Sequence, residues 1–310
     1  MKSKEKKSTS DVTQSICQMV TDKLVGMMEQ GVNPWRKPWM HCAEDMAISH
    51  TNGKPYSLLN QMLLGFRSGE YLTFNQVKKE GGTVKKGARS EIIVFWQCGV
   101  FKNVDKPNDT TDDSEEEETE SKWVAWHNPI LKYYHVFHID DTEGIQAKYP
   151  QKEPELISNI NPIENAENTA NSFCSRSGVR LVIQKSNSAY YRPSTDTVTV
   201  PLREQFEEIS EFYSTLFHEL THSTGHPLRL NRLKGGIHKA SEKYSREELV
   251  AEIGAATCLS ILGIECKETE ENSVAYLKSW SKFLKNDPKA FVVAAGKAEK
   301  AISLIFGDEN

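Results

Sequence analysis

The segment His218-Glu219-Leu220-Thr221-His222 constrains this chain of 310 residues more strongly than any other stretch. Apolar residues recur around it at intervals of three and four, which predicts a helix with one buried face over residues 204–224. Gly225 stands where a C-terminal cap belongs, and Pro227 prevents the helix from continuing. Residues four apart share a helical face, so the two imidazoles can reach a single ion, with Glu219 beside them.

This pattern is typical of zinc hydrolases of the metallopeptidase kind, and it predicts a Zn²⁺ ion held by His218 and His222. Zinc lowers the pKa of a coordinated water from about 16 to near 7, so hydroxide becomes available at neutral pH. A carboxylate beside the ion can accept the proton and pass it to the leaving amine, and we expect Glu219 to be this general base.

A catalytic zinc takes three protein ligands and keeps one open position. In the metzincin pattern a third histidine lies three residues beyond the glycine, but Leu228 stands there, so that pattern is excluded. A helix expected around residues 245–254 carries Glu248 and Glu252 one turn apart on one face. This resembles the gluzincin arrangement, in which the first acid binds the metal and the second orients a ligand histidine. We therefore predict Glu248 as the third ligand and Glu252 behind it, with the reverse assignment left open.

Other features near this site have competing interpretations. Ser245 and Glu248 also match a capping box, which would place Glu248 at a helix N-terminus instead of on the metal. Tyr244 is the residue predicted to support an oxyanion. The alternatives for that role are His226, Arg229 and Arg232. The strand expected at 196–200 is either an edge that binds an extended peptide by strand addition or an ordinary strand of the sheet.

The net charge of −5 conceals an uneven distribution of charge along the chain. Residues 1–90 contain 14 Lys and Arg against 8 Asp and Glu, whereas residues 105–120 contain nine acids and one lysine. The acidic run lacks apolar residues, so we expect a disordered loop within a hairpin, acting either as a spacer or as a nucleic-acid mimic. The basic N-terminal half remains compatible with nucleic acid, although the overall charge argues against it.

Hydropathy and cysteine usage indicate a cytoplasmic protein with no membrane partner. Neither a run of about 18 apolar residues nor an apolar stretch after the basic N-terminus occurs in the sequence. Six cysteines stand singly, without CxxC spacing, and are expected to be free thiols. They are Cys17, Cys42, Cys98, Cys174, Cys258 and Cys266.

Composition shifts divide the chain into two expected domains of an α+β protein. The expected bounds are a disordered tail at 1–10, a first domain at 11–147 with the acidic insert at 105–120, a linker at 148–163 and a second domain at 164–310. Within the first domain we expect helices at 11–31, 56–66 and 73–80, then strands at 91–96, 124–126 and 132–138. In the second we expect a helix at 164–177, strands at 179–184, around 190 and at 195–200, and helices to the end.

Aromatic and basic residues alternate in the first ninety residues, as single-stranded nucleic acid requires. Cations contact phosphates, and ring faces stack on unpaired bases at about 1–3 kcal/mol each. The alternative is that the rings fill the core and the lysines form a solvated face, and composition alone does not separate the two. The predicted contacts are Trp35, Arg36, Lys37, Trp39, Lys54, Tyr56, Phe74, Lys78, Lys79, Lys85 and Lys86.

Taken together, the motifs resemble those of the ArdC-type antirestriction proteins of plasmids and other mobile elements. The N-terminal half also resembles the corresponding region of TraC-type primases. In that half the resemblance rests on Gly31-Val-Asn-Pro-Trp-Arg-Lys-Pro-Trp39, Asn52-Gly-Lys-Pro-Tyr56, Leu72-Thr-Phe-Asn-Gln76, Gly82-Thr-Val-Lys-Lys-Gly87 and Tyr134-His-Val-Phe137. In the second half it rests on Ala189-Tyr-Tyr-Arg-Pro193, His218 to Pro227, Arg229-Leu-Asn-Arg232 and Glu247-Glu-Leu-Val-Ala-Glu252.

The resemblance implies an N-terminal domain that binds single-stranded DNA and a C-terminal zincin-like metallopeptidase domain of the gluzincin type. It implies action on incoming single-stranded DNA during conjugation, shielding it from restriction. The expected function is therefore an antirestriction protein that binds this DNA and hydrolyses a peptide bond in an unknown protein. The alternative is a non-enzymatic DNA-protection protein whose zinc braces the fold, although structural zinc normally has four ligands.

Overall fold

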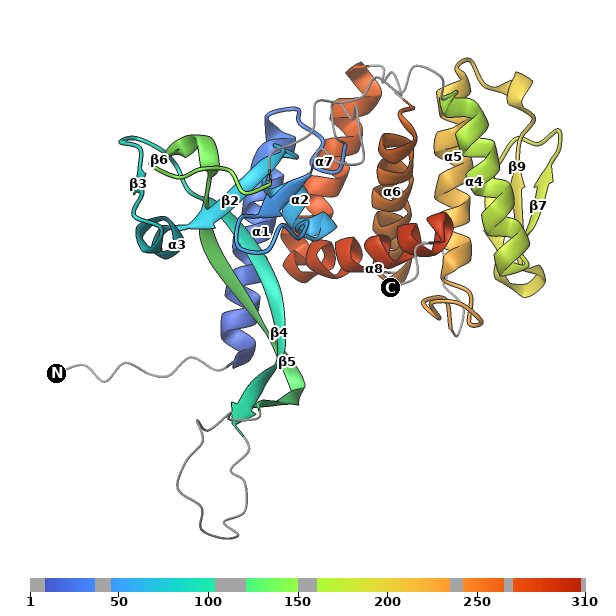
Figure 1. Cartoon of the computed structure of the whole chain (residues 1–310). Helices are drawn as coiled ribbons and strands as arrows, with labels where there is room; N and C mark the ends of the chain where they lie inside the picture. The colour runs from blue at the N-terminus through green and yellow to red at the C-terminus, as the bar shows by residue number, and fades with distance from the viewer. Residues whose placement is uncertain are drawn as a thin grey trace, which may run out of the picture.

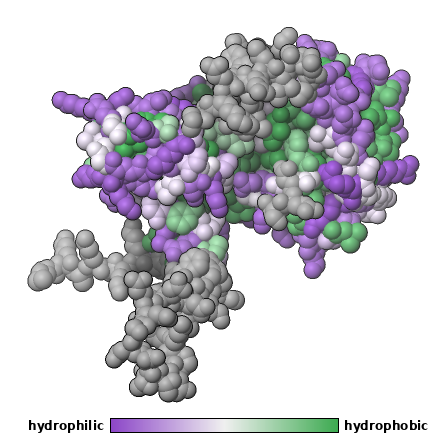
Figure 2. Space-filling model, in the orientation of Figure 1, coloured by the Kyte–Doolittle hydropathy of each residue, from purple (hydrophilic) through white to green (hydrophobic). Residues whose placement is uncertain are grey.

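The computed structural model describes residues 9–36, 46–103, 121–149, 161–234, 242–264 and 270–307. It has a mixed α+β architecture, which confirms the predicted fold class. In the view of Figure 1 the N-terminal half lies on the left around one sheet, and the helices of the C-terminal half lie on the right. On the face shown in Figure 2, hydrophilic side chains cover much of the N-terminal half, and apolar surface gathers around the middle of the molecule.

The N-terminal half contains a four-stranded sheet with the order β1-β2-β5-β4. Its strands are β1 (Ala47–Ser49), β2 (Gly69–Thr73), β4 (Glu91–Asn103) and β5 (Ser121–His138). β4 and β5 are antiparallel and form a long hairpin that extends beyond the body of the molecule (Figure 1). The accompanying elements are α1 (Thr9–Glu29), α2 (Leu58–Leu63), α3 (Phe74–Lys79), η1 (Ile139–Asp141) and the small pair β3 (Thr83–Val84) and β6 (Thr142–Glu143).

The C-terminal half places helices beside a three-stranded sheet with the order β7-β9-β8. The strands are β7 (Arg180–Ile183), β8 (Tyr190–Arg192) and β9 (Thr197–Val200), with short turns η2 (Pro193–Thr195) and η3 (Arg203–Gln205). The helices are α4 (Pro162–Ser177), α5 (Ile209–Thr224), α6 (Glu242–Leu262), α7 (Glu270–Asn286) and α8 (Pro288–Phe306). α5 and α6 pack side by side (Figure 1).

Local sequence signals account for several helix boundaries. Thr73 and Gln76 form a reciprocal capping box at the start of α3. The Asn161 side chain accepts the N–H of Ile163 where α4 begins, and Gly178 ends that helix in the left-handed conformation at φ 75°. These signals act within one turn of the chain, so the predicted helices at 73–80 and 164–177 agree with the structure to within two residues.

The hydrophobic core crosses between the two halves of the chain. α1 packs against α7 and α8, and Trp35 contacts the rings of Tyr276, Trp280 and Phe291 at centroid distances of 5.7–6.3 Å. Trp35 is only 1% exposed. The prediction that its ring stacks on a base is therefore wrong, because the apolar helices of the C-terminal half cover it.

A second core holds α5 in place between the small sheet, α4, α6 and α8. Gly254 makes the close contact with α6 possible, since a Cβ atom there would lie 2.6 Å from Cγ2 of Thr221. Thr221 belongs to the HExxH segment, so this contact brings α6 against the same stretch of α5 that carries the two histidines. A larger residue at 254 would push the two helices apart.

Three expectations about elements need correction. The helix predicted at 204–224 begins only at Ile209, because the Gln205 side chain bonds to the backbone of Ser186 and residues 203–205 form a separate turn. The strands predicted at 124–126 and 132–138 are parts of the single strand β5. β9 lies in the middle of its sheet, so the edge-strand interpretation of residues 196–200 is wrong.

Other predictions can be compared with the structure only in part. Thr9 and Ser10, assigned to a disordered tail, already lie in α1, and the acidic insert at 105–120 falls outside the described residues. Cys17, Cys98, Cys174 and Cys258 are free thiols as predicted, whereas Cys42 and Cys266 lie outside the described part. None of the helices in the described ranges combines the length and apolar character that crossing a membrane requires.

Candidate metal centre

Two neighbouring helices bring together the three predicted ligands. His218 and His222 lie one turn apart on α5, and their Nε2 atoms are 3.2 Å apart. From α6, Glu248 places Oε2 3.5 Å from Nε2 of His218 and Oε1 3.3 Å from Nε2 of His222. Nitrogens bound to one tetrahedral ion at about 2.0–2.1 Å stand roughly 3.3 Å apart. The donor set therefore fits a single divalent ion of the size of zinc.

The Nδ1 atom of each histidine lies near a carboxylate other than that of Glu248. Oε1 of Glu252 lies 3.8 Å from Nδ1 of His218, and Oε1 of Glu247 lies 3.5 Å from Nδ1 of His222. A carboxylate behind the imidazole keeps the proton on Nδ1 and leaves the Nε2 lone pair for a metal. Glu252 is itself held by the Tyr276 hydroxyl, which donates to Oε2 at 2.6 Å.

Glu247 is a site residue that sequence reasoning missed. Its carboxylate forms an ion pair with the guanidinium of Arg232 at 2.8 Å. The Glu247 side chain is only 6% exposed and that of Arg232 only 5%. Arg232 also donates to the carbonyl of Thr221 and to the hydroxyl of Thr224, both at the end of α5. The only sequence signal was the consecutive pair Glu247-Glu248, whose two carboxylates are directed to different nitrogens of His222.

The electrostatics of the site favour an ionised Glu248 and a proton on His222. Burial alone would raise the pKa of Glu248, but hydrogen bonds from His218 and His222 hold it far below its ordinary value. Burial alone would lower the pKa of His222, but its bonds to Glu247 and Glu248 raise it to about 9. A metal ion must displace such a proton to bind the imidazole.

Glu219 and Tyr244 complete the surroundings of the three donors. Glu219 is 8% exposed; burial raises its pKa, opposed mainly by the charges of His222 and His218. The backbone of Tyr191 on β8 hydrogen-bonds to the same carboxylate, which places that edge strand beside the site. Burial, followed by a hydrogen bond with Glu248, raises the pKa of the Tyr244 hydroxyl to about 12.

The remaining alternatives for these roles have structural explanations. α6 begins at Glu242, so Ser245 and Glu248 lie inside the helix and the capping-box interpretation is wrong. The Arg229 guanidinium bonds to Asp196 and to the Ser223 carbonyl, which ties the turn before β9 to α5. Arg232 is bound to Glu247, so neither arginine is directed at an oxyanion position.

The predicted nucleic-acid contacts are spread over the surface of the N-terminal half. Phe74 is 47% exposed, and the ammonium group of Lys78 lies 4.7 Å from the centre of its ring. Lys54, Lys79, Lys85 and Lys86 are exposed, and Arg36 and Tyr56 are half-buried. Lys37 and Trp39 fall outside the described residues.

Four exposed rings on the β4–β5 hairpin were absent from the predicted contacts. Phe95, Trp96, Tyr133 and Tyr134 are each 40–45% exposed. Phe95 and Tyr134 stack with their centroids 5.2 Å apart and their planes at 18°. The rings form two consecutive pairs, so each pair places one ring on either face of the hairpin, and only the structure could show that all four stay exposed.

Comparison with known proteins finds similarity in two parts of the chain. Residues 14–137 match the N-terminal domain of anti-restriction factor ArdC, and residues 168–297 match a zincin-like metallopeptidase. The crystal structure of the antirestriction ArdC protein from plasmid R388 aligns with a TM-score of 0.63 at 30% identity, covering 94% of this chain and 96% of that one. The chain belongs to the ArdC antirestriction family. The same R388 protein has also been solved with Mn(II) bound.

Curated relatives extend this ArdC-family relationship to longer proteins. Two DNA primases TraC of Escherichia coli are 31% and 28% identical over 304 and 317 residues, but this chain spans only 20% and 28% of their lengths. The uncharacterised protein y4eC of Sinorhizobium fredii (strain NBRC 101917 / NGR234) is 28% identical, with 92% of its length covered. This chain is therefore similar to only a part of each primase.

Proposed function

We propose that this chain is an antirestriction protein that binds incoming single-stranded DNA and carries a zinc metallopeptidase site acting on an unknown protein. The observation that carries the peptidase part is the convergence of three donors, His218, His222 and Glu248, beside the buried carboxylate of Glu219. Structural zinc is closed by four ligands, whereas three ligands with a base leave one position open for chemistry. Within the described residues, this group of three is the only candidate metal cluster.

The positions of the residues support the following proposed roles. A divalent zinc ion held by His218, His222 and Glu248 would supply a Lewis acid that activates water and polarises a carbonyl. Glu219 accepts the proton of the attacking water and delivers it to the leaving amine. Tyr244 donates a hydrogen bond to the oxyanion after it turns from Glu248, and Glu252 orients His218.

The edge strand β8 provides a place for the substrate backbone. Tyr191 on β8 already hydrogen-bonds to Glu219, so a peptide added along this edge would pass the general base. Strand addition uses main-chain hydrogen bonds and is tolerant of side-chain sequence. This arrangement suits a peptidase whose specificity comes from elsewhere, such as tethering to DNA.

The ligand assignment makes a direct prediction about metal content. We expect about one zinc per chain in the wild type, a large loss in Glu248→Ala, and a smaller loss in Glu252→Ala, because only Glu248 reaches both Nε2 atoms. Removing a group that orients a metal ligand typically lowers metal affinity by about 10–100-fold. The measurement is elemental analysis after dialysis, with Mn(II) as a second ion. Full occupancy in Glu248→Ala with loss in Glu252→Ala would reverse the two assignments.

For the N-terminal half we propose a single-stranded-DNA-binding domain at 11–147, joined by a linker at 148–163 to the peptidase domain at 164–310. Support comes from the ArdC family membership and from the exposed basic and aromatic side chains of that half. The contacts proposed are Arg36, Lys37, Trp39, Lys54, Tyr56, Phe74, Lys78, Lys79, Lys85 and Lys86. We also propose that the protein acts in the cytoplasm.

Salt dependence tests this proposal. The plot of log affinity for single-stranded DNA against log salt should have a slope of about −0.7 per phosphate neutralised. We expect Lys78→Gln/Lys79→Gln to reduce the slope by about 1.4 in the full chain, whereas Lys278→Gln/Lys282→Gln on α7 makes the same charge change and should leave it unaltered. Titrations of a labelled oligonucleotide at several salt concentrations measure both. Equal slopes in the two double variants would show that α3 does not belong to the DNA-binding surface.

A further inference from the structure

A pocket of about 360 Å³ lies where α2, the edge strand β4 and α8 meet. It is formed by residues from both halves of the chain, and it is distinct from the metal centre on α5 and α6. It is lined by the loop before α2, by α2 itself, by β4 and β5, and by α8. The lining residues that matter below are Tyr56, Trp96, Gly296 and Glu299.

An aromatic residue of β4, Trp96, lines this pocket on the same strand face as Val94 and Leu131. Trp96 is 41% exposed although it lines the pocket, so part of its surface is available to a ligand. The side chain of the neighbouring Phe95 points to the opposite face of the strand, where its ring stacks on Tyr134. The Asn60 side chain fixes the strand itself, since it bonds to both the N–H and the carbonyl of Val94 at 2.8 Å. The pocket thus presents Trp96 on a strand that is held in place.

Polar groups also line the pocket or lie next to it in the chain. The Glu299 carboxylate accepts the N–H of Leu58 at 2.8 Å and retains further acceptor sites for an N–H group of a base. Lys54 directly precedes the lining residue Pro55, and Lys300 lies one helical turn beyond Gly296, on the same face of α8. Both lysines are exposed, so segments that line the pocket also carry cations toward solvent.

We propose that this pocket receives an unpaired base of single-stranded nucleic acid, stacked against Trp96. The proposal rests on the proposed DNA binding of this chain and gives it a location. Every base has a π-face, so stacking accepts any sequence, and Lys54 and Lys300 on the neighbouring segments bind the flanking phosphates. A base within a duplex cannot enter without leaving its stack, so the pocket selects single strands.

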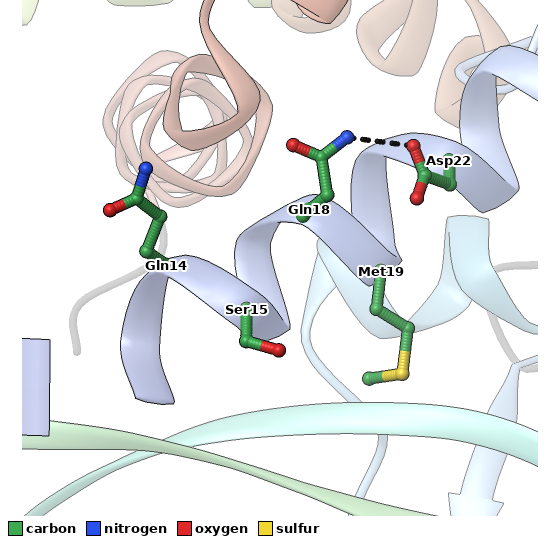
Figure 3. Close-up of a pocket in the computed structure, with 5 residues that line it drawn as sticks. All are labelled: Gln14, Ser15, Gln18, Met19 and Asp22. Atoms are coloured by element: carbon green, nitrogen blue, oxygen red, sulfur yellow. Dashed lines mark hydrogen bonds between the residues drawn. The ribbon is translucent and has the colours of Figure 1, made fainter. Parts of the chain in front are cut away.

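A larger hollow along α1 is lined by neither aromatic nor basic residues. It measures about 570 Å³ and is lined by Gln14, Ser15, Gln18, Met19 and Asp22 (Figure 3). Gln18 donates to Asp22 at 2.7 Å, and neither a cation nor an aromatic ring is among these lining residues. An acidic, non-aromatic surface of this kind does not attract a nucleic acid strand.

Gly296 allows the pocket to be filled without disturbing the fold. A Cβ atom added there meets no atom within 4 Å, so the leucine of Gly296→Leu extends into the open space. Leucine also favours the helix more than glycine does. Gly26 on α1 likewise meets nothing within 4 Å, which makes Gly26→Leu a matched control away from the pocket.

The test uses the full chain and a fluorescein-labelled oligothymidylate, with binding followed by anisotropy. We expect Gly296→Leu to weaken binding between about fivefold and a hundredfold, the loss of one stacked base, and Gly26→Leu to bind like the wild type. An abasic oligonucleotide of the same length should bind Gly296→Leu and the wild type equally. Trp96→Ala, a change at an exposed ring, should weaken oligothymidylate binding by at least about fivefold.

The possible results distinguish failure of the pocket proposal from failure of the proposed DNA binding. A wild type that fails to bind oligothymidylate defeats the proposed DNA binding itself. Wild-type affinity in Gly296→Leu and Trp96→Ala overturns the pocket while leaving DNA binding intact. Equal weakening of abasic and oligothymidylate binding by Gly296→Leu also overturns it, because the backbone rather than a base would then lie in the pocket. Thermal denaturation of Gly296→Leu should show a midpoint no lower than that of the wild type.

Discussion

Glu219→Gln should lower the rate of peptide hydrolysis by about 10²–10⁴ while leaving the zinc content near one per chain. The amide keeps the shape of the carboxylate but cannot accept the proton of water. Glu219 is outside the proposed ligand set, so its replacement leaves His218, His222 and Glu248 in place. Hydrolysis of an unfolded protein such as casein, read by mass spectrometry, measures the rate, and Glu211→Gln, an exposed acid on the same helix, is the control.

The same variant separates the enzymatic interpretation from the alternative of a purely protective protein. Restriction of incoming plasmid DNA should be measured during conjugation in cells that carry Glu219→Gln. If protection is lost together with hydrolysis, the protein works as an enzyme. Protection that persists in Glu219→Gln but is lost in Lys78→Gln/Lys79→Gln would show that DNA binding suffices and that the metal serves the fold.

Arg232→Met should lower the free energy of unfolding by about 3 kcal/mol, because it leaves the buried Glu247 carboxylate without the guanidinium and with only His222 as a charged partner. The two side chains are 5% and 6% exposed, so water cannot replace the guanidinium. The variant also removes the bonds from Arg232 to Thr221 and Thr224 at the end of α5. Urea denaturation in the presence of a chelator measures this loss without a contribution from bound metal.

Arg246 provides a matched control for this effect. It forms an ion pair with Asp287, but its side chain is 47% exposed, so Arg246→Met should cost no more than about 1 kcal/mol. Arg232→Met/Glu247→Met should recover much of the stability, since neither charge is then left unpaired. Metal affinity should stay reduced in that double variant, because His222 lacks its carboxylate. A cost below 1 kcal/mol in Arg232→Met would mean that the buried pair contributes little to the fold.

The predicted helices at 73–80 and 164–177 and the pairing of His218 with His222 agree with the structure, and each depends on residues close in sequence. Such signals are complete in the sequence, because helix geometry fixes how residues three and four apart are placed. The local capping-box interpretation of Ser245 and Glu248 failed, because α6 begins before Ser245. The start of α5 was missed because Gln205 bonds to Ser186, a partner that periodicity cannot reveal.

The sequence by itself determined the chemistry of the site: two imidazoles on one helical face, a carboxylate between them and an acidic helix to follow. Tertiary structure decided which acid can bind a metal and which can orient a histidine. Glu247, Glu248 and Glu252 lie on one helix, and each faces different atoms of the two histidines on α5. It also decided that Trp35 is core, because apolar helices from the far end of the chain cover it. A hydrophobic pattern shows that a face is buried, and only the packing of distant elements shows what buries it.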